Sequence, residues 1–162
     1  MEQLENMQEI EAAQTALGQF LVSMMPVPWE KICFYADAAP GTTSIWFALV
    51  ESETKVICTS DFFFKRYERY SVEKMESYVK LSDMIEALYE AYVIRFGQNS
   101  VWKAMYYTLQ SDGLVHIDFE HELPKGNMIE RHDAVFRKFF DAKYRYYYTK
   151  YPSVEIGKKP IS

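Results

Sequence analysis

The sequence has 162 residues, of which 49% are hydrophobic and 25% charged, and its formal net charge is −5. This length and composition suit a single domain that builds its own core without a structural metal or disulfide. The acidic balance argues against nucleic acid as the partner. The acidic N-terminus lacks the cationic region of a signal peptide, and the apolar runs are too short to cross a bilayer, so we expect a cytoplasmic protein.

The N-terminal segment predicts a helix over residues 2–25. Its apolar residues recur at three- and four-residue spacing and form one stripe. They are Leu4, Met7, Ile10, Leu17, Phe20, Leu21 and Met24. Pro26 and Pro28 end this helix, because the residue before a proline leaves the helical region.

Three strands are predicted next. Lys31 to Ala38 and Thr43 to Glu51 flank the Pro40-Gly41 turn and form a hairpin, and Lys55 to Thr59 follows. The aromatic run from Asp61 to Tyr70 is ambiguous and is either an irregular segment or a fourth strand. Cys33 and Cys58 lie in apolar runs and are predicted to be buried free thiols, although a disulfide between neighbouring strands stays open.

The second half of the chain predicts a helix and a hairpin. Ser71 is the expected N-cap of a helix that reaches about Phe96, where Gly97 stops it. Strands over residues 101–110 and 114–122 then flank a turn at Asp112-Gly113, which tolerates positive φ.

A last helix is predicted from Met128 to about Tyr148, with residues 151–162 as a loose tail to a single domain over residues 1–150. Hairpin connections imply antiparallel pairing. We therefore expect an α+β fold with an antiparallel sheet of about five to six strands and helices packed on one face. The expected order is helix, strands, helix, hairpin, helix.

The strand over residues 114–122 alternates between apolar and polar side chains. Val115, Ile117 and Phe119 are predicted to face the core. The opposite face carries His116, Asp118, Glu120 and Glu122. Three interpretations of that face stay open: a metal site, a ridge that binds a basic partner, and a plain solvated surface.

No catalytic set is evident in the sequence. The three histidines have no nucleophile or acid at a catalytic spacing, and the glycines form no phosphate-binding motif. The Tyr-rich segment over residues 144–151 is better explained as a helix end than as a nucleic-acid site. We therefore expect no catalytic residue, no metal and no cofactor.

Several segments, in this order, resemble the YezG-like family. Residues 25–32 (MPVPWEKI) are similar to its I-P-x-x-W-x-K segment, and residues 115–123 (VHIDFEHEL) to its F-x-I-x-F-D-Y-E-D-L strand. Trp102, Asp112-Gly113 and Glu130-Arg131 stand in the corresponding places. The resemblance spans roughly residues 5–140, and the chain departs from the pattern at His121 and Phe136.

The resemblance implies an immunity protein, encoded beside a polymorphic or contact-dependent bacterial toxin that is often a nuclease. Such a protein binds and neutralises its cognate toxin domain in the cytoplasm and is not an enzyme. The acidic residues that we expect to bind the toxin are Asp112, Asp118, Glu120, Glu122 and Glu130. The alternatives are a small metal-dependent hydrolase that uses His116, Asp118 and Glu120, and a regulatory or scaffold module.

Overall fold

A computed structural model gives the structure of residues 2–39, 42–70 and 72–140. The helices are α1 (Glu2–Met24), α2 (Ser60–Arg66), the 3-10 helix η1 (Glu68–Tyr70), α3 (Lys74–Phe96) and α4 (Met128–Phe139). The strands are β1 (Trp29–Ala39), β2 (Thr42–Glu51), β3 (Ile57–Thr59), β4 (Ala104–Gln110) and β5 (Val115–Glu120).

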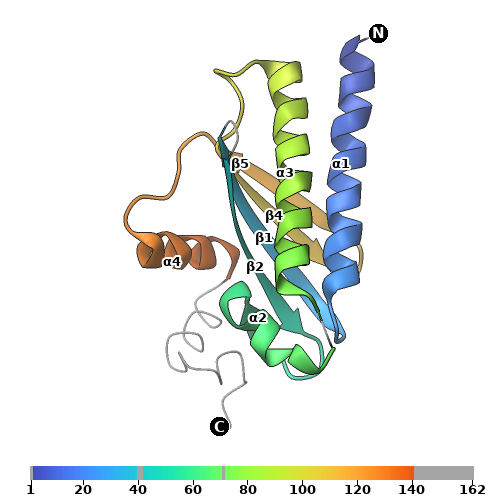
Figure 1. The fold of residues 1–162 in the computed structure, drawn as a ribbon, viewed down its shortest axis with the longest axis vertical. Coiled ribbons are helices and arrows are strands. Elements are labelled where there is room, and N and C mark those ends of the chain that lie inside the picture. The colour runs from blue at the N-terminus through green and yellow to red at the C-terminus, as the bar shows by residue number, and fades with distance from the viewer. Residues whose placement is uncertain (1, 40–41, 71, 141–162) are drawn as a thin grey trace.

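The strands form one five-stranded sheet in the order β3-β2-β1-β4-β5, with every neighbouring pair antiparallel (Figure 1). The long strand β1 lies at the centre, where Tyr35 stands opposite Trp46 of β2 and Tyr106 of β4. The predicted α+β class, the antiparallel sheet and the order of elements are confirmed.

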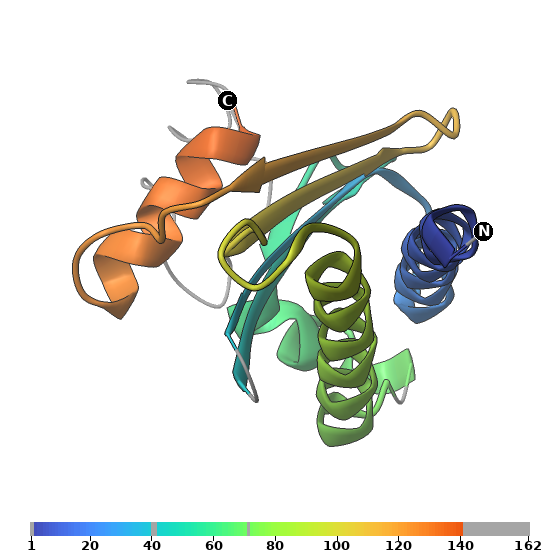
Figure 2. The ribbon, with the colours of Figure 1, turned by 90° about the horizontal axis from the view of Figure 1, so that it is seen from above.

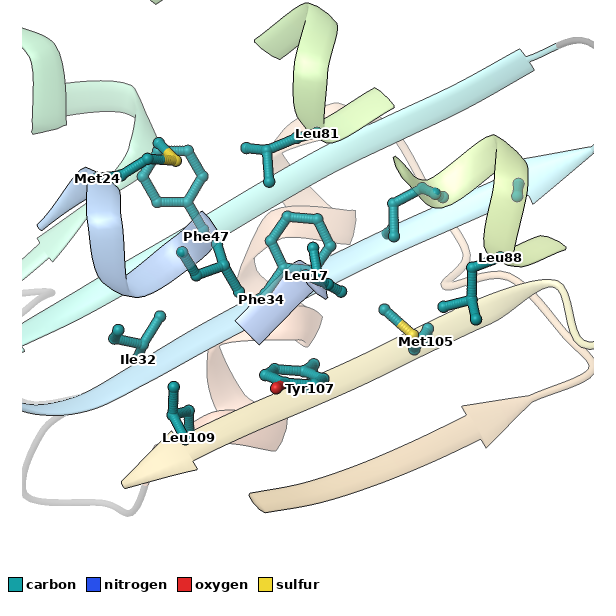
Figure 3. Close-up of a cluster of buried hydrophobic side chains, with 14 of the residues drawn as sticks. Leu17, Met24, Ile32, Phe34, Phe47, Leu81, Leu88, Met105, Tyr107 and Leu109 are labelled. Carbon is teal, nitrogen blue, oxygen red and sulfur yellow. The ribbon is translucent and has the colours of Figure 1, made fainter. Parts of the chain in front are cut away.

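The main core lies between one face of the sheet and the pair of helices α1 and α3. Ile32 and Phe34 of β1 point toward these helices, and β2 and β4 add further apolar side chains (Figure 3). Leu17 of α1 and Leu81 of α3 are fully buried above them. Of the predicted stripe of α1, Ile10, Leu17, Leu21 and Met24 are buried in this core, whereas Met7 keeps 36% of its surface exposed.

The helix α4 packs on the opposite face of the sheet (Figure 2). Phe139 of α4 stacks on Trp46 with 6.0 Å between ring centroids, and both lie in a second cluster with Cys33 and Tyr35. The prediction that the helices pack on one face is therefore wrong for α4. The physical reason is that both sets of alternate residues in β1 are apolar, which requires cover on both faces.

The segment from Asp61 to Tyr70 forms α2 and η1, so both predictions for it, a strand or an irregular segment, are wrong. Phe63 and Tyr67 are spaced by four residues, and both are buried against the main core. This spacing places the two rings on one side of a helix.

Several element boundaries differ from the predicted ones. The helix α3 starts at Lys74 after the N-cap Glu73, and Ser71 lies outside the described residues. The strand β4 starts at Ala104 rather than at residue 101. The helix α4 ends at Phe139, since the next residue is extended; the rest of the predicted helix and the predicted tail lie outside the described residues.

Other local predictions are confirmed. Gly97 ends α3 with φ of +89°, and Gly113 takes φ of +91° in the β4–β5 turn. Cys33 and Cys58 are buried free thiols, and burial raises the pKa of each to about 12.

Candidate functional site

The predicted acidic residues belong to the β4–β5 hairpin and the segment that follows it. Residues 111–122 carry four carboxylates and no Lys or Arg. The strand β5 lies at the edge of the sheet and pairs with β4 on one side. Within the described part of the chain, no strand pairs with its other side. The acidic segment is thus presented at a sheet edge.

Asp112 holds the turn of the hairpin. Its Oδ1 accepts a hydrogen bond from the backbone N of Leu114 at 2.9 Å, and the backbone N of Gly113 donates to the carbonyl of Gln110 at 2.9 Å. An aspartate that binds the backbone two residues on stabilises a tight turn. Asp112 is exposed, so its carboxylate both fixes the turn and reaches solvent.

Asp118 and Glu120 lie side by side on the face of β5 that looks toward α4. Lys138 of α4 forms an ion pair with Glu120, and its Nζ lies 3.9 Å from Oδ2 of Asp118. The Lys138 ammonium also lies 4.2 Å from the ring centre of Tyr106. Two carboxylates therefore share one ammonium, and both keep about half of their side-chain surface exposed, at 54% and 40%.

Glu122 and Glu130 do not join this pair. Glu122 is exposed and follows the end of β5, whereas Asp112 precedes its start. The six residues of β5 span roughly 20 Å between them. Glu130 forms a capping box with Asn127: its backbone N donates to Asn127 Oδ1 at 2.9 Å, and Asn127 N donates to Glu130 Oε1 at 3.4 Å. The structure thus brings together Asp118 and Glu120 alone among the five predicted residues.

The metal site proposed as an alternative is not formed by the residues expected for it. His116 Nε2 lies 3.9 Å from Asp118 Oδ2. Even so, no group of three His, Cys, Asp or Glu side chains among the described residues is arranged to hold a metal ion. The row His116, Asp118 and Glu120 runs along a strand and does not converge on one point.

A buried polar network at the end of β2 was missed by the sequence analysis. Glu51 is 7% exposed, and Arg66 of α2 donates to both of its oxygens, at 2.8 and 3.2 Å. Tyr67 also donates to this carboxylate, as does Thr54 at 2.6 Å. Burial alone would raise the pKa of Glu51, but these hydrogen bonds and the Arg66 charge outweigh burial and lower it.

A cavity of about 290 Å³ with both polar and apolar walls lies between the sheet and the first half of α4. Tyr35 donates to Asp37 Oδ2 at 2.9 Å inside it. Burial raises the pKa of Asp37, although the Tyr35 hydrogen bond and the Arg131 and His132 charges oppose the rise. Trp46 Nε1, on the cavity wall, has no hydrogen-bond partner among the described residues.

An open groove of about 650 Å³ runs between α1 and the β4–β5 hairpin. The walls from α1 include Gly18 and Val22, and the sheet contributes Leu109, Val115 and Ile117. Val115 and Ile117 of β5 therefore line a groove and are not fully covered. Val115, predicted to face the core, keeps 44% of its surface exposed.

A family model described as "Immunity protein YezG-like" matches residues 10–161. This match extends past the roughly 5–140 range on which the sequence resemblance rests. No curated protein matches the chain. None of the described helices is long and apolar enough to cross a membrane.

Proposed function

Because the chain belongs to the family of YezG-like immunity proteins, we propose that it binds one cognate bacterial toxin domain and neutralises it by occupying it. The family match over residues 10–161 is the observation that carries this proposal. We propose further that the toxin is a nuclease, that the two proteins meet in the cytoplasm, and that the toxin belongs to a polymorphic or contact-dependent system.

The charge of the β4–β5 hairpin supports a nuclease as the partner. A protein domain that handles nucleic acid needs cationic side chains to contact phosphates. Residues 111–122 present four carboxylates and no Lys or Arg at a sheet edge. Such a surface is complementary to a cationic cleft and would speed association with it. The proposed inhibitor therefore acts by binding and not by catalysis.

We propose Asp118 and Glu120 as the centre of the toxin-binding surface. Lys138 neutralises only part of their charge, and both remain accessible. A toxin Lys or Arg that approached this pair would meet a preformed anionic site, because Lys138 already holds both side chains in place. Asp112, Glu122 and Glu130 lie apart from this pair, and we propose them as separate further contacts with the toxin.

The function is tested with the toxin domain encoded next to the gene for this chain. Cells that express that domain alone should stop growing, and coexpression of this chain should restore growth. The two purified proteins should form a stoichiometric complex by size-exclusion chromatography. Continued toxicity on coexpression, together with the absence of any complex, would contradict the proposal.

The surface is tested by neutralising its two central carboxylates. Asp118→Asn with Glu120→Gln should weaken toxin binding by a factor on the order of ten or more, because close charge pairs across such interfaces couple by about 1.5–7 kcal/mol. The matched control is Asp83→Asn with Glu90→Gln, which changes the net charge equally at two exposed positions of α3.

Binding would be measured by calorimetry at two salt concentrations, after circular dichroism has shown that both double variants are folded. The α3 control should bind nearly as tightly as the wild type. Equal affinity of the two double variants would remove Asp118 and Glu120 from the interface and leave the immunity function itself untouched.

A further inference from the structure

The outer edge of β5 carries backbone groups that are not used by the sheet. The backbone N of Gln110 donates to the carbonyl of Leu114 at 2.9 Å, so these two residues are a hydrogen-bonded pair of the ladder between β4 and β5. Bonded and non-bonded pairs alternate along an antiparallel ladder. In the observed register, the N–H and C=O groups that point away from β4 are those of Val115, Ile117 and Phe119.

The two sides of this edge differ in chemistry. On the side of α1, Val115 and Ile117 form one wall of the open apolar groove of about 650 Å³. On the side of α4, Asp118 and Glu120 are exposed beside Lys138. A strand placed next to β5 would expose alternate side chains to these two surroundings, since successive residues of a strand point to opposite faces.

We propose that an extended segment of the toxin adds to β5 as a further strand of the sheet. This inference rests on the proposed function and gives the chemistry of the segment that is recognised. Its backbone would bond to Val115, Ile117 and Phe119. Its alternate side chains would be apolar toward the groove and cationic toward Asp118 and Glu120. Strand addition of this kind derives affinity from the backbone and specificity from alternate side chains.

The negative charge of Asp118 and Glu120 favours a cationic toxin segment over a second copy of this chain as the strand that pairs with β5. If two copies of β5 paired, the faces that carry Asp118 and Glu120 would come together on one side of the joined sheet. Like charges on directly neighbouring strands are destabilising. An edge strand that carries charged side chains is also a common protection against such self-association. A cationic segment meets no such penalty.

The first test follows amide hydrogen exchange of the full chain, free and in complex with the toxin domain encoded next to its gene. Strand addition predicts that the amides of Val115, Ile117 and Phe119 become at least about tenfold slower to exchange in the complex. The amides of His116 and Asp118 serve as internal controls, because they already bond to β4 in the free protein.

The second test removes one outward N–H. Val115→Pro deletes a donor that β4 does not use, at a side chain that is 44% exposed, so the variant should fold. Val115→Ala trims the side chain and keeps the N–H. We expect Val115→Pro to bind the toxin domain roughly five- to tenfold more weakly than Val115→Ala, because one intermolecular hydrogen bond is lost.

The outcomes separate this inference from the proposed function. Toxin binding without slower exchange at the three outward amides overturns strand addition and leaves the immunity function standing. Failure of the wild-type chain to bind the toxin domain overturns both. Slower exchange that depends on the concentration of the free chain, without toxin, would show a second copy as the occupant and would also overturn the inference.

Discussion

The carboxylate of Glu51 is buried and held by three side chains. Arg66, Tyr67 and Thr54 all donate to it, and it ties the end of β2 to α2. No pattern in the sequence predicts this contact, since Arg66 lies fifteen residues away in a segment that forms a helix instead of a strand. The cysteines were easier to predict, because a small apolar side chain within an apolar run is buried in most arrangements.

Glu51→Gln should lower the free energy of unfolding at pH 7 by about 1–3 kcal/mol, because Arg66 would lose its charged partner. The pKa of Glu51 is lowered in the folded state. Its contribution to stability is therefore complete above the unfolded pKa of about 4.3 and is lost as the pH falls through the folded pKa. The difference between wild type and variant should thus shrink below about pH 4.

Urea unfolding of both proteins between pH 7 and pH 3 measures this difference. Glu53→Gln is the control, because Glu53 is exposed two residues away, and it should change stability by less than about 0.5 kcal/mol. A Glu51→Gln difference that did not vary with pH would show that the network stabilises the fold without its charge.

Gly18 is required by the close approach of α1 to β4. A Cβ at this position would lie 2.4 Å from the hydroxyl oxygen of Tyr107. Gly18→Ala should therefore destabilise by about 1–3 kcal/mol through overpacking, although alanine alone favours a helix by about 1 kcal/mol. In a Tyr107→Phe background the nearest remaining atom is 3.6 Å away, so the same substitution should become stabilising.

Thermal unfolding of the four proteins in this cycle gives the coupling energy between the two positions. We predict that the effect of Gly18→Ala on stability changes sign, from destabilising in the wild type to stabilising in the Tyr107→Phe background. A general intolerance of α1 to substitution would not produce this change. A Gly18→Ala variant that stays destabilised by the same amount when the Tyr107 hydroxyl is absent would place the clash elsewhere.

At the scale of elements, hydrophobic periodicity predicted α1, β1, β2 and the β4–β5 hairpin. It did not predict that helices cover both faces of the sheet. In β1, Ile32 and Phe34 alternate with Cys33 and Tyr35, and both pairs are buried. That pattern already indicates cover on two faces, but it does not identify the helix that supplies the second cover. The helix α4 covers the second face, where Phe136 and Phe139 pack in one cluster with Trp46 and Tyr106.

The start of α4 is fixed by its capping box. Asn127→Ala should destabilise the protein by about 1 kcal/mol, because the backbone N of Glu130 loses its acceptor. Asn127→Asp keeps an acceptor and should be nearly neutral. Chemical denaturation followed by tryptophan fluorescence would report the loss, since Trp46 lies beneath α4. Equal stability of the Ala and Asp variants would show that the cap contributes little once α4 is packed.

At the scale of the whole molecule, the sheet separates two apolar layers of unequal size. The larger layer holds two helices of 23 residues, α1 and α3, whereas the smaller one holds α4 with 12 residues. The candidate site lies where the sheet ends, between these layers. Its acidic row was predictable from alternation along β5, but the groove beside it was not, since its walls come from residues about ninety positions apart.

The two layers should open at different free energies, and the two cysteines report on them separately. Cys33 lies in the smaller cluster beneath α4, and Cys58 lies in the main core. Local opening of α4 would expose Cys33 while α1 and α3 stay packed. We expect a thiol reagent to label Cys33 at least about tenfold faster than Cys58 in the absence of denaturant, because partial opening costs less than global unfolding.

Single-thiol variants Cys58→Ala and Cys33→Ala allow each rate to be measured alone over a range of urea concentrations. The rate at Cys33 should depend weakly on urea, because little surface is exposed when α4 detaches, whereas the rate at Cys58 should follow global unfolding. Burial raises the pKa of both thiols to about 12, so labelling requires opening at either site. Identical rates with identical urea dependence would mean that both layers unfold as one unit.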